Sequence, residues 1–367
     1  MNPCQRRGGV AQDRAARLSA RGVKEEWTRL VSDRAAGKLH AYVHIPFCAR
    51  RCVYCHHHTQ TLQRGALQAY CGRLLSQVRF YEDAFSRTPI SSLFVGGGTP
   101  AVLSCRQIEA VFSCYMAAFP FRDDAVRTFE FTPGTVEAEK VRLLRQLGFS
   151  RVSMGVQTFG AATLQAMNRG DQSPRSVSRA ADILHRAGFP HGFNLDLLAG
   201  FSGVEDALTS FESAARLEPS QITVNLLDRH PDGARKENLV RLHDDFIELA
   251  EKLPSLAADL GYGFRPVLGA LRLLPTDPDW TFSRRGADGR LAPHMYGWRD
   301  TDDVRPLRRR NSVFAIGHSA RSYLLGRAII WEDTKAGNGF DPESCSYAVR
   351  RLPFLRCGRD IYSANFP

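Results

Sequence analysis

Short apolar runs alternate with longer amphipathic stretches along most of this chain. Strands are predicted at residues 41–45, 92–95, 127–132, 151–154, 192–198 and 221–226. Helices are predicted between them, at residues 67–84, 106–118, 136–147, 175–187 and 204–216. A strand, helix, strand order repeated in this way predicts an α/β fold with parallel strands and right-handed crossovers. The active site is then expected at the carboxyl ends of the strands.

Three cysteines, Cys48, Cys52 and Cys55, lie in the loop after the first predicted strand, with the spacing C-x3-C-x2-C. Three thiolates so close together suit one face of a 4Fe-4S cluster, whereas four would close it. The fourth iron then has an open coordination position. Such a position is typical of a reactive metal site, whereas a structural site has all its positions filled by protein ligands. Structural zinc is the alternative, but zinc sites usually pair two such cysteine knuckles, and no matching second one follows.

The stretch from Tyr42 to Cys55 reads Tyr-x-His-Ile-Pro-Phe-Cys-x3-Cys-x2-Cys. It resembles the opening signature of radical S-adenosylmethionine (SAM) enzymes, specifically the branch similar to oxygen-independent coproporphyrinogen III oxidase. The resemblance implies a partial (β/α)6 radical SAM barrel. It also implies that the open iron binds the amino and carboxylate groups of SAM, and that the reduced cluster cleaves SAM to a 5'-deoxyadenosyl radical.

Further motifs of that family follow the next two predicted strands. The resemblance assigns Gly97, Gly98 and Thr99, in a Gly-Gly-Gly-Thr-Pro loop, to the amino end of SAM. Consecutive glycines let a backbone approach a ligand closely. Glu130, in Phe-Glu-Phe-Thr-Pro-Gly, is implied to hold the SAM amino group, since a buried carboxylate needs a cationic partner. The alternative for Glu130 is an outward-facing salt bridge.

Gln157 and Arg169 lie in stretches similar to the family's Gly-Val-Gln-Ser-Phe and its following arginine. Gln157 can exchange hydrogen bonds with a ribose hydroxyl, and Arg169 can bind a carboxylate with two N–H groups. Asp196, in Asn-x-Asp-Leu, is implied to accept from the ribose hydroxyls. Tyr54 lies where aromatic residues of this family stack near the adenine, and Tyr42 lies on the preceding strand. Both tyrosines are equally compatible with a packing role.

The resemblance has gaps. Family members usually read Gly-Leu-Pro where this chain reads Gly200-Phe201-Ser202. We expect an N-terminal extension at 1–40, the partial barrel at 41–262, and a small C-terminal, substrate-covering subdomain at 263–367 that lacks a full winged domain. The region 264–310 looks like a specialised insertion. Its candidates for an aromatic substrate pocket, with a structural lid as the alternative, are Trp280, His294, Tyr296 and Trp298.

These departures favour a class C radical SAM enzyme, a methyltransferase or cyclopropanase of natural-product biosynthesis. It would move a one-carbon unit onto an sp2 carbon of a small-molecule substrate, with a second SAM as methylene donor. The alternatives are a porphyrin-directed, coproporphyrinogen oxidase-like enzyme and a haem chaperone. A reducing partner such as flavodoxin or ferredoxin is expected, and a partner methyltransferase is compatible with the chemistry.

Composition narrows the partners and the compartment. The net charge is +11, but only six of the 49 basic residues are Lys, and no dense basic run with interleaved aromatics occurs. A nucleic-acid partner is therefore not expected. Nine cysteines, with no signal peptide and no apolar run of membrane-spanning length, favour a reducing cytoplasm and no membrane association.

Overall fold

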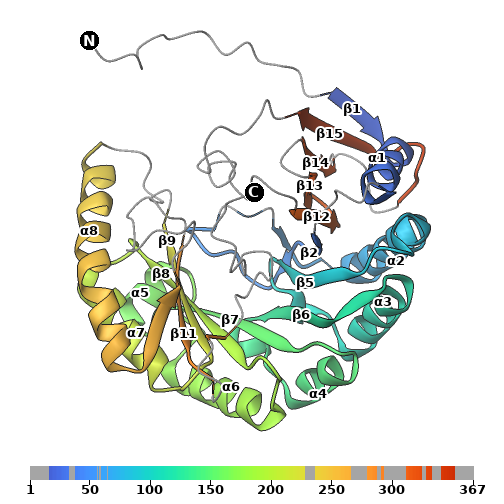
Figure 1. The fold of residues 1–367 in the computed structure, drawn as a ribbon. Coiled ribbons are helices and arrows are strands. Elements are labelled where there is room, and N and C mark those ends of the chain that lie inside the picture. Colours follow the sequence, from blue (N-terminus) through green and yellow to red (C-terminus); the bar gives the residue numbers. More distant parts are fainter. Residues whose placement is uncertain are drawn as a thin grey trace, which may run out of the picture.

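A curved sheet with an outer layer of helices forms the framework of the protein (Figure 1). The computed structural model describes residues 16–32, 38–55, 57, 59–63, 65–227, 236–265, 279–286, 291–292, 311–324, 328–332 and 340–351. Its main sheet has thirteen strands in the order β1-β15-β14-β13-β12-β2-β5-β6-β7-β8-β9-β11-β10.

Six parallel strands in sequence order form the centre of this sheet: β2 (Lys38–Ile45), β5 (Ile90–Gly97), β6 (Phe121–Phe131), β7 (Arg151–Gln157), β8 (Phe193–Ala199) and β9 (Gln221–Leu226). The helices between them are α2 (Ala66–Phe85), α3 (Cys105–Ala118), α4 (Ala138–Gln146), α5 (Ala161–Ala166), α6 (Pro174–Ala187) and α7 (Val204–Ala215). The predicted α/β fold is confirmed. β6 is longer than expected, because it begins at Phe121 rather than near residue 127.

Strands from both ends of the chain extend the sheet. On one side lie β11 (Asp279–Arg284), antiparallel to β9, and β10 (Tyr262–Arg265), with α8 (Lys236–Asp259) between β9 and β10 in sequence. On the other side β12 (Asn311–Ile316) runs parallel to β2, followed by β13 (Arg321–Leu324), β14 (Ala328–Glu332), β15 (Ser346–Arg351) and β1 (Ala16–Ser19). A short pair, β3 (Phe47–Cys48) and β4 (Gln60–Thr61), lies apart from the main sheet.

The helix α1 (Ala20–Ser32) joins the N-terminal stretch to the core. Its Trp27 is fully buried and contacts Phe85 and Phe314, with ring centroids 5.4 and 5.6 Å away. The described part of residues 1–40 thus contributes a strand to the main sheet and a side chain to its core.

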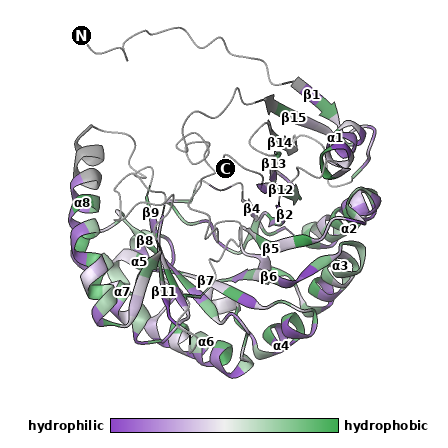
Figure 2. Ribbon diagram, in the orientation of Figure 1, coloured by the Kyte–Doolittle hydropathy of each residue, from purple (hydrophilic) through white to green (hydrophobic). Residues whose placement is uncertain are grey.

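The two faces of the central strands differ in polarity, because successive side chains of a strand point to opposite faces. Residues on the outer face are apolar and contact the helices: Phe129 packs against Phe112 of α3, and Phe282 of the adjoining strand β11 packs in the same way against Phe211 of α7. Figure 2 shows hydrophobic and hydrophilic residues alternating along these helices, as expected for amphipathic helices that cover a sheet. The inner face carries polar side chains instead.

The predicted pocket role of Trp280 is wrong. Trp280 is 1% exposed and points to the outer face of β11, where its ring lies 6.5 Å from that of Phe246 on α8. His294, Tyr296 and Trp298 lie outside the described residues. Of the helices that the structure describes, none is both long enough and apolar enough to span a lipid bilayer.

Candidate active site

The cysteine loop follows β2 and contacts the segments that carry Thr99 and Arg169. Cys48 Sγ lies 3.6 Å from Thr99 Oγ1, and Cys52 Sγ accepts a 3.5 Å hydrogen bond from Arg169 Nη1. Burial raises the pKa of Cys55 to about 11, and the neighbouring Cys52 and Cys48 add to the shift. The three predicted thiols therefore lie close enough to affect one another's charge.

The described side chains of the cysteine loop are not arranged to bind a single metal ion. Among the described residues, no group of three or more His, Cys, Asp or Glu side chains is arranged to hold one metal ion. In a 4Fe-4S cube each thiolate binds a different iron atom, so the three sulfurs need not converge on one point. Three cysteines in one loop, with a guanidinium donating to one sulfur, fit the anionic sulfur shell of such a cluster.

The turn after α5 holds the outer side of the cysteine loop. Val53 N donates to Met167 O at 3.3 Å, and Asn168 Nδ2 donates to Arg51 O at 2.8 Å. Asn168 has a left-handed backbone, with φ at 61°, which Asn tolerates better than most residues. These contacts bring Arg169 next to Cys52.

Gly97 and Gly98 pack directly on the segment that leads into the cysteine loop. A Cβ on Gly98 would lie 2.6 Å from Phe47 O and 3.0 Å from Cys48 Sγ. Gly97 has φ at 115°, and its Cβ would lie 2.6 Å from the ring of His44. Side chains at these positions would push the two loops apart. Close packing thus explains why glycine occupies both positions. Thr99, in the same loop as these glycines, contacts Cys48.

Glu130 lies on the inner face near the end of β6, not in an outward salt bridge. A Cβ on Gly96 would lie 2.7 Å from Glu130 Oε2, and the backbone N–H of Gly97 donates to this carboxylate. Burial, together with the charge of Asp196, raises the pKa of Glu130 well above its ordinary value. A cationic ligand beside this group would reverse the shift.

Asp196, on the inner face of β8, is held by neighbouring donors. Ser153 Oγ donates to Oδ2 at 2.6 Å and Asn194 Nδ2 donates to Oδ1 at 3.0 Å. Burial raises the pKa of Asp196 to about 6 despite these hydrogen bonds. Together with Glu130, it places two carboxylates at the end of the sheet that carries the cysteine loop.

Arg169 spans the gap between β7 and the cysteine loop. Its Nη2 donates to Gly155 O at 2.7 Å and to Gln172 Oε1 at 2.9 Å, while Nη1 donates to Cys52. Its Nε is buried and has no hydrogen-bond partner in the part of the chain that the structure describes. A buried donor of this kind is costly, and an anionic ligand would satisfy it.

Gln157 ends β7 with a backbone φ of 70°, which is unusual for a residue other than glycine. Its Nε2 would lie 3.0 Å from a Cβ at Gly155, so the side chain turns back along the strand. Backbone strain of this kind is concentrated at functional sites. The position of Gln157 beside the Arg169 contact at Gly155 O agrees with a binding role.

The two predicted tyrosines occupy different places. Tyr42 lies on the inner face of β2, where its hydroxyl is 2.9 Å from His44 Nδ1 and its ring stacks on Phe94 at 6.2 Å. Tyr54 lies in the cysteine loop, and its ring meets that of Phe201 edge-on at 6.3 Å. Burial raises the pKa of Tyr54 well above its ordinary value, while Arg169 opposes the shift.

Sequence reasoning missed His44, Ser153 and Asn194, which contact the predicted site residues directly. A signal for all three exists, since His44 and Asn194 each lie two residues from a predicted site residue on the same strand, and Ser153 lies opposite Glu130 on the neighbouring strand. Asp206, which hydrogen-bonds two of the site loops, has no such signal.

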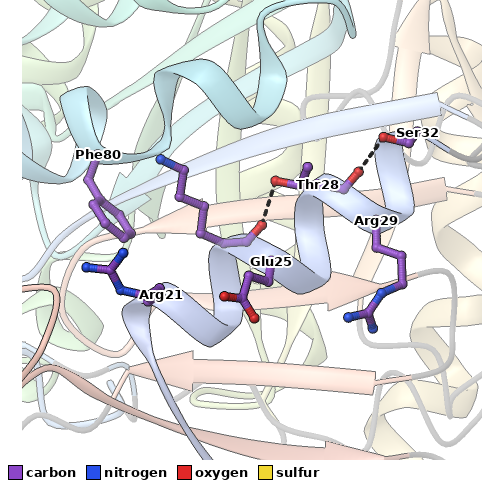
Figure 3. Close-up of a pocket in the computed structure, with 7 residues that line it drawn as sticks. Arg21, Glu25, Thr28, Arg29, Ser32 and Phe80 are labelled. Carbon is purple, nitrogen blue, oxygen red and sulfur yellow. Dashed lines mark hydrogen bonds between the residues drawn. The ribbon is translucent and has the colours of Figure 1, made fainter.

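A separate pocket lies on the outside of the protein, between α1 and Phe80 of α2 (Figure 3). Its cationic side chains already have acidic neighbours: Lys24 pairs with Asp83, and Arg29 with Glu26. Arg21 pairs in the same way with Glu343. The pocket therefore offers little uncompensated charge to a ligand.

Comparisons with known proteins agree with this geometry. Residues 42–209 match the family described as the Radical SAM superfamily. The chain is 31% identical over 294 residues to the "Heme chaperone HemW" of Lactococcus lactis, covering 78% of this chain and 70% of the relative. It is 32% identical over 190 residues to the "Oxygen-independent coproporphyrinogen III oxidase" of Synechocystis, covering 51% of this chain and 40% of that protein.

The chain spans about half the length of several curated relatives that it matches, such as the "Heme chaperone HemW" of Haemophilus influenzae, with 31% identity over 55% of the relative. Among solved structures, the coproporphyrinogen III oxidase HemN of Escherichia coli aligns with a TM-score of 0.71. It is 22% identical, and the alignment covers 91% of this chain and 76% of HemN. This likeness shows that the two proteins share a fold.

Proposed function

Because the chain belongs to the radical SAM superfamily, in the branch of oxygen-independent coproporphyrinogen III oxidases and the heme chaperone HemW, we propose that its cysteine loop binds a 4Fe-4S cluster that cleaves SAM. One observation carries the proposal: the cysteine loop, Arg169 and two buried carboxylates lie at the same end of the sheet. When bound, the cluster supplies the electron for reductive cleavage of SAM. A reducing partner such as flavodoxin or ferredoxin would deliver that electron.

Different residues of the site then bind different groups of the SAM molecule. Glu130 binds the SAM ammonium group, which supplies the positive partner that this carboxylate lacks among the described residues. Arg169 offers its buried Nε to the SAM carboxylate, because three of its four other N–H groups already bind Gly155, Gln172 and Cys52. Asp196 and Gln157 accept from and donate to the ribose hydroxyls.

A porphyrin-directed role is the first candidate for the substrate. The similarity to coproporphyrinogen III oxidases and to HemW supports it, and it comprises either oxidation of a porphyrinogen or delivery of haem.

A class C reaction is the second candidate, with a second SAM as methylene donor for C-methylation or cyclopropanation. The Gly200-Phe201-Ser202 segment favours it, because Phe201 packs against Tyr54 and so changes the wall of the site where family members usually read Gly-Leu-Pro.

Anaerobic reconstitution with iron and sulfide, followed by dithionite reduction with SAM, tests the proposal. Chromatography should detect 5'-deoxyadenosine, and Cys52→Ala should abolish it. S-adenosylhomocysteine as an additional product would favour the class C candidate, whereas deoxyadenosine alone would favour a porphyrinogen oxidase. Stoichiometric haem binding without deoxyadenosine would indicate a carrier. A fully loaded cluster that yields no deoxyadenosine with SAM, with or without coproporphyrinogen III, would contradict the proposed cleavage of SAM.

A further inference from the structure

Asp206, in the first turn of α7, accepts hydrogen bonds from two different loops of the site. Ser202 Oγ donates to Oδ2 at 2.6 Å, from the loop after β8. Thr158 Oγ1 donates to the same oxygen at 2.8 Å, from the loop after β7, and Thr163 Oγ1 reaches Oδ1 at 3.4 Å. One carboxylate therefore joins two loops that are far apart in sequence.

Each of these loops carries a residue of the proposed SAM site directly before the hydroxyl. Gln157, with its left-handed backbone, precedes Thr158. Phe201, whose ring contacts Tyr54 of the cysteine loop, precedes Ser202. A movement of either hydroxyl would therefore move a side chain at the ribose or the adenine end of the site.

The fit around Asp206 is close. A Cβ on Gly160 would overlap Asp206 Oδ1, so the loop after β7 lies directly against the carboxylate. Ser210, one turn further along α7, donates or accepts at 3.0 Å with Thr158 Oγ1 and accepts from Phe159 N at 3.0 Å. The backbone that follows Gln157 is thus fixed from α7 at two adjacent residues.

This arrangement coincides with the departure from the family pattern. Where family members usually have proline, a residue that restricts the backbone, this chain has Ser202, whose hydroxyl binds Asp206. In this chain the hydrogen bond from Ser202 to the Asp206 carboxylate restrains the loop after β8 instead.

We propose that Asp206 is a positioning residue that fixes the ribose and adenine ends of the SAM site relative to each other through Thr158 and Ser202. The inference rests on the proposed function, since it concerns the same site. Asp206 itself does not contact the ligand, and its effect is therefore on SAM affinity rather than on cluster assembly.

The test measures SAM binding to reconstituted, unreduced protein by equilibrium dialysis, so that no turnover occurs. Asp206→Asn should weaken binding about tenfold, which corresponds to roughly 1.4 kcal/mol. In reduced protein the KM for SAM should rise while kcat for deoxyadenosine stays the same. Iron content should match that of the wild type.

Glu205→Gln is the matched control, because Glu205 is an exposed acid in the same first turn of α7. It removes the same favourable charge from the helix N-terminus without touching either loop. Binding of SAM should be unchanged in this variant. Equal weakening by Glu205→Gln and Asp206→Asn would overturn the inference in favour of a simple effect on the helix.

Thr158 variants decide the matter if Asp206→Asn fails to fold. Thr158→Ser keeps the hydroxyl and should retain SAM affinity, whereas Thr158→Val should weaken it. Equal affinity in these two variants, or wild-type affinity in a folded Asp206→Asn protein, would overturn the positioning role while leaving the proposed function intact. A wild-type protein with an intact cluster that binds no SAM would overturn both.

Discussion

The inner face of the sheet is polar at both ends of its strands, but the buried polar groups at the two ends differ in their partners. At the amino ends of the strands, Arg151 Nη2 donates to Gln221 Oε1 at 3.0 Å, and Gln221 Nε2 donates to Ser283 Oγ at 2.7 Å. At the carboxyl ends, Glu130 and Asp196 are buried near each other, and burial raises the pKa of both.

The difference indicates which end is built for stability and which for binding. At the amino ends, the hydrogen bonds that join Arg151, Gln221 and Ser283 offset part of the cost of burying these groups. The carboxylates at the other end lack a cation among their described contacts, and the charged form of each is disfavoured. A binding site for a cationic ligand would look like this before the ligand arrives. Four predictions test the contrast.

The largest effect is expected at the cysteine loop. Cys48→Ala should prevent stable cluster assembly, because only two cysteine ligands would remain in the loop. Iron and sulfide content after reconstitution should fall to background. Cys105→Ala is the control, since Cys105 begins α3, outside the cysteine loop. An intact cluster in Cys48→Ala would contradict the assignment of the loop.

Asp196→Asn should remove part of the pH dependence of stability. The pKa of Asp196 lies at about 6 in the folded protein, above the ordinary value of 3.8. Between these values the unfolded state binds fewer protons, so the free energy of unfolding falls as pH rises, by up to roughly 3 kcal/mol. Denaturant unfolding of the cluster-free protein at several pH values between 4 and 7 measures this. The same pH slope in both proteins would contradict the assigned pKa.

Glu130→Gln should weaken SAM binding about tenfold to a hundredfold, as expected for loss of a charged hydrogen-bond acceptor worth about 1.5–3 kcal/mol. Equilibrium dialysis with reconstituted protein measures the change. Glu139→Gln serves as control, since Glu139 is exposed in the first turn of α4. Unchanged affinity for SAM in the Glu130→Gln protein would show that this carboxylate does not bind SAM.

Arg151→Met should have the smallest effect, and of another kind. Loss of the hydrogen bond to Gln221 should lower the free energy of unfolding by about 1–2 kcal/mol. The affinity for SAM in the folded protein should not change, because Arg151 lies at the amino end of β7. Weaker SAM binding in a stably folded Arg151→Met protein would remove the distinction between the two ends.

The central strands could be predicted from sequence because their signals are local, and the structure brings the candidate site residues to one end of the sheet. Alternation of apolar runs with amphipathic stretches identifies β5 or α6, and the cysteine spacing identifies the cysteine loop as the candidate cluster site. The antiparallel strands at both edges could not be predicted, since β1 pairs with β15 across almost the whole chain. Such pairing depends on contacts that no short window contains.

Two errors of interpretation have the same origin. Trp280 was expected to face a pocket, but its direction follows from the register in which it pairs with Val224, and this register places it on the outer face. Asp206 carried no motif, because its hydroxyl partners Thr158 and Ser202 come from separate loops. In both cases the deciding information is spatial.

The most direct test of the account is the electron paramagnetic resonance spectrum of the reduced, reconstituted protein with and without SAM. We predict a cluster signal that depends on Cys48, Cys52 and Cys55 and that changes when SAM is added, because SAM would bind the open iron beside Glu130 and Arg169. A signal that is the same with saturating SAM, from a protein with a complete cluster, would contradict the assignment of this end of the sheet as a SAM site.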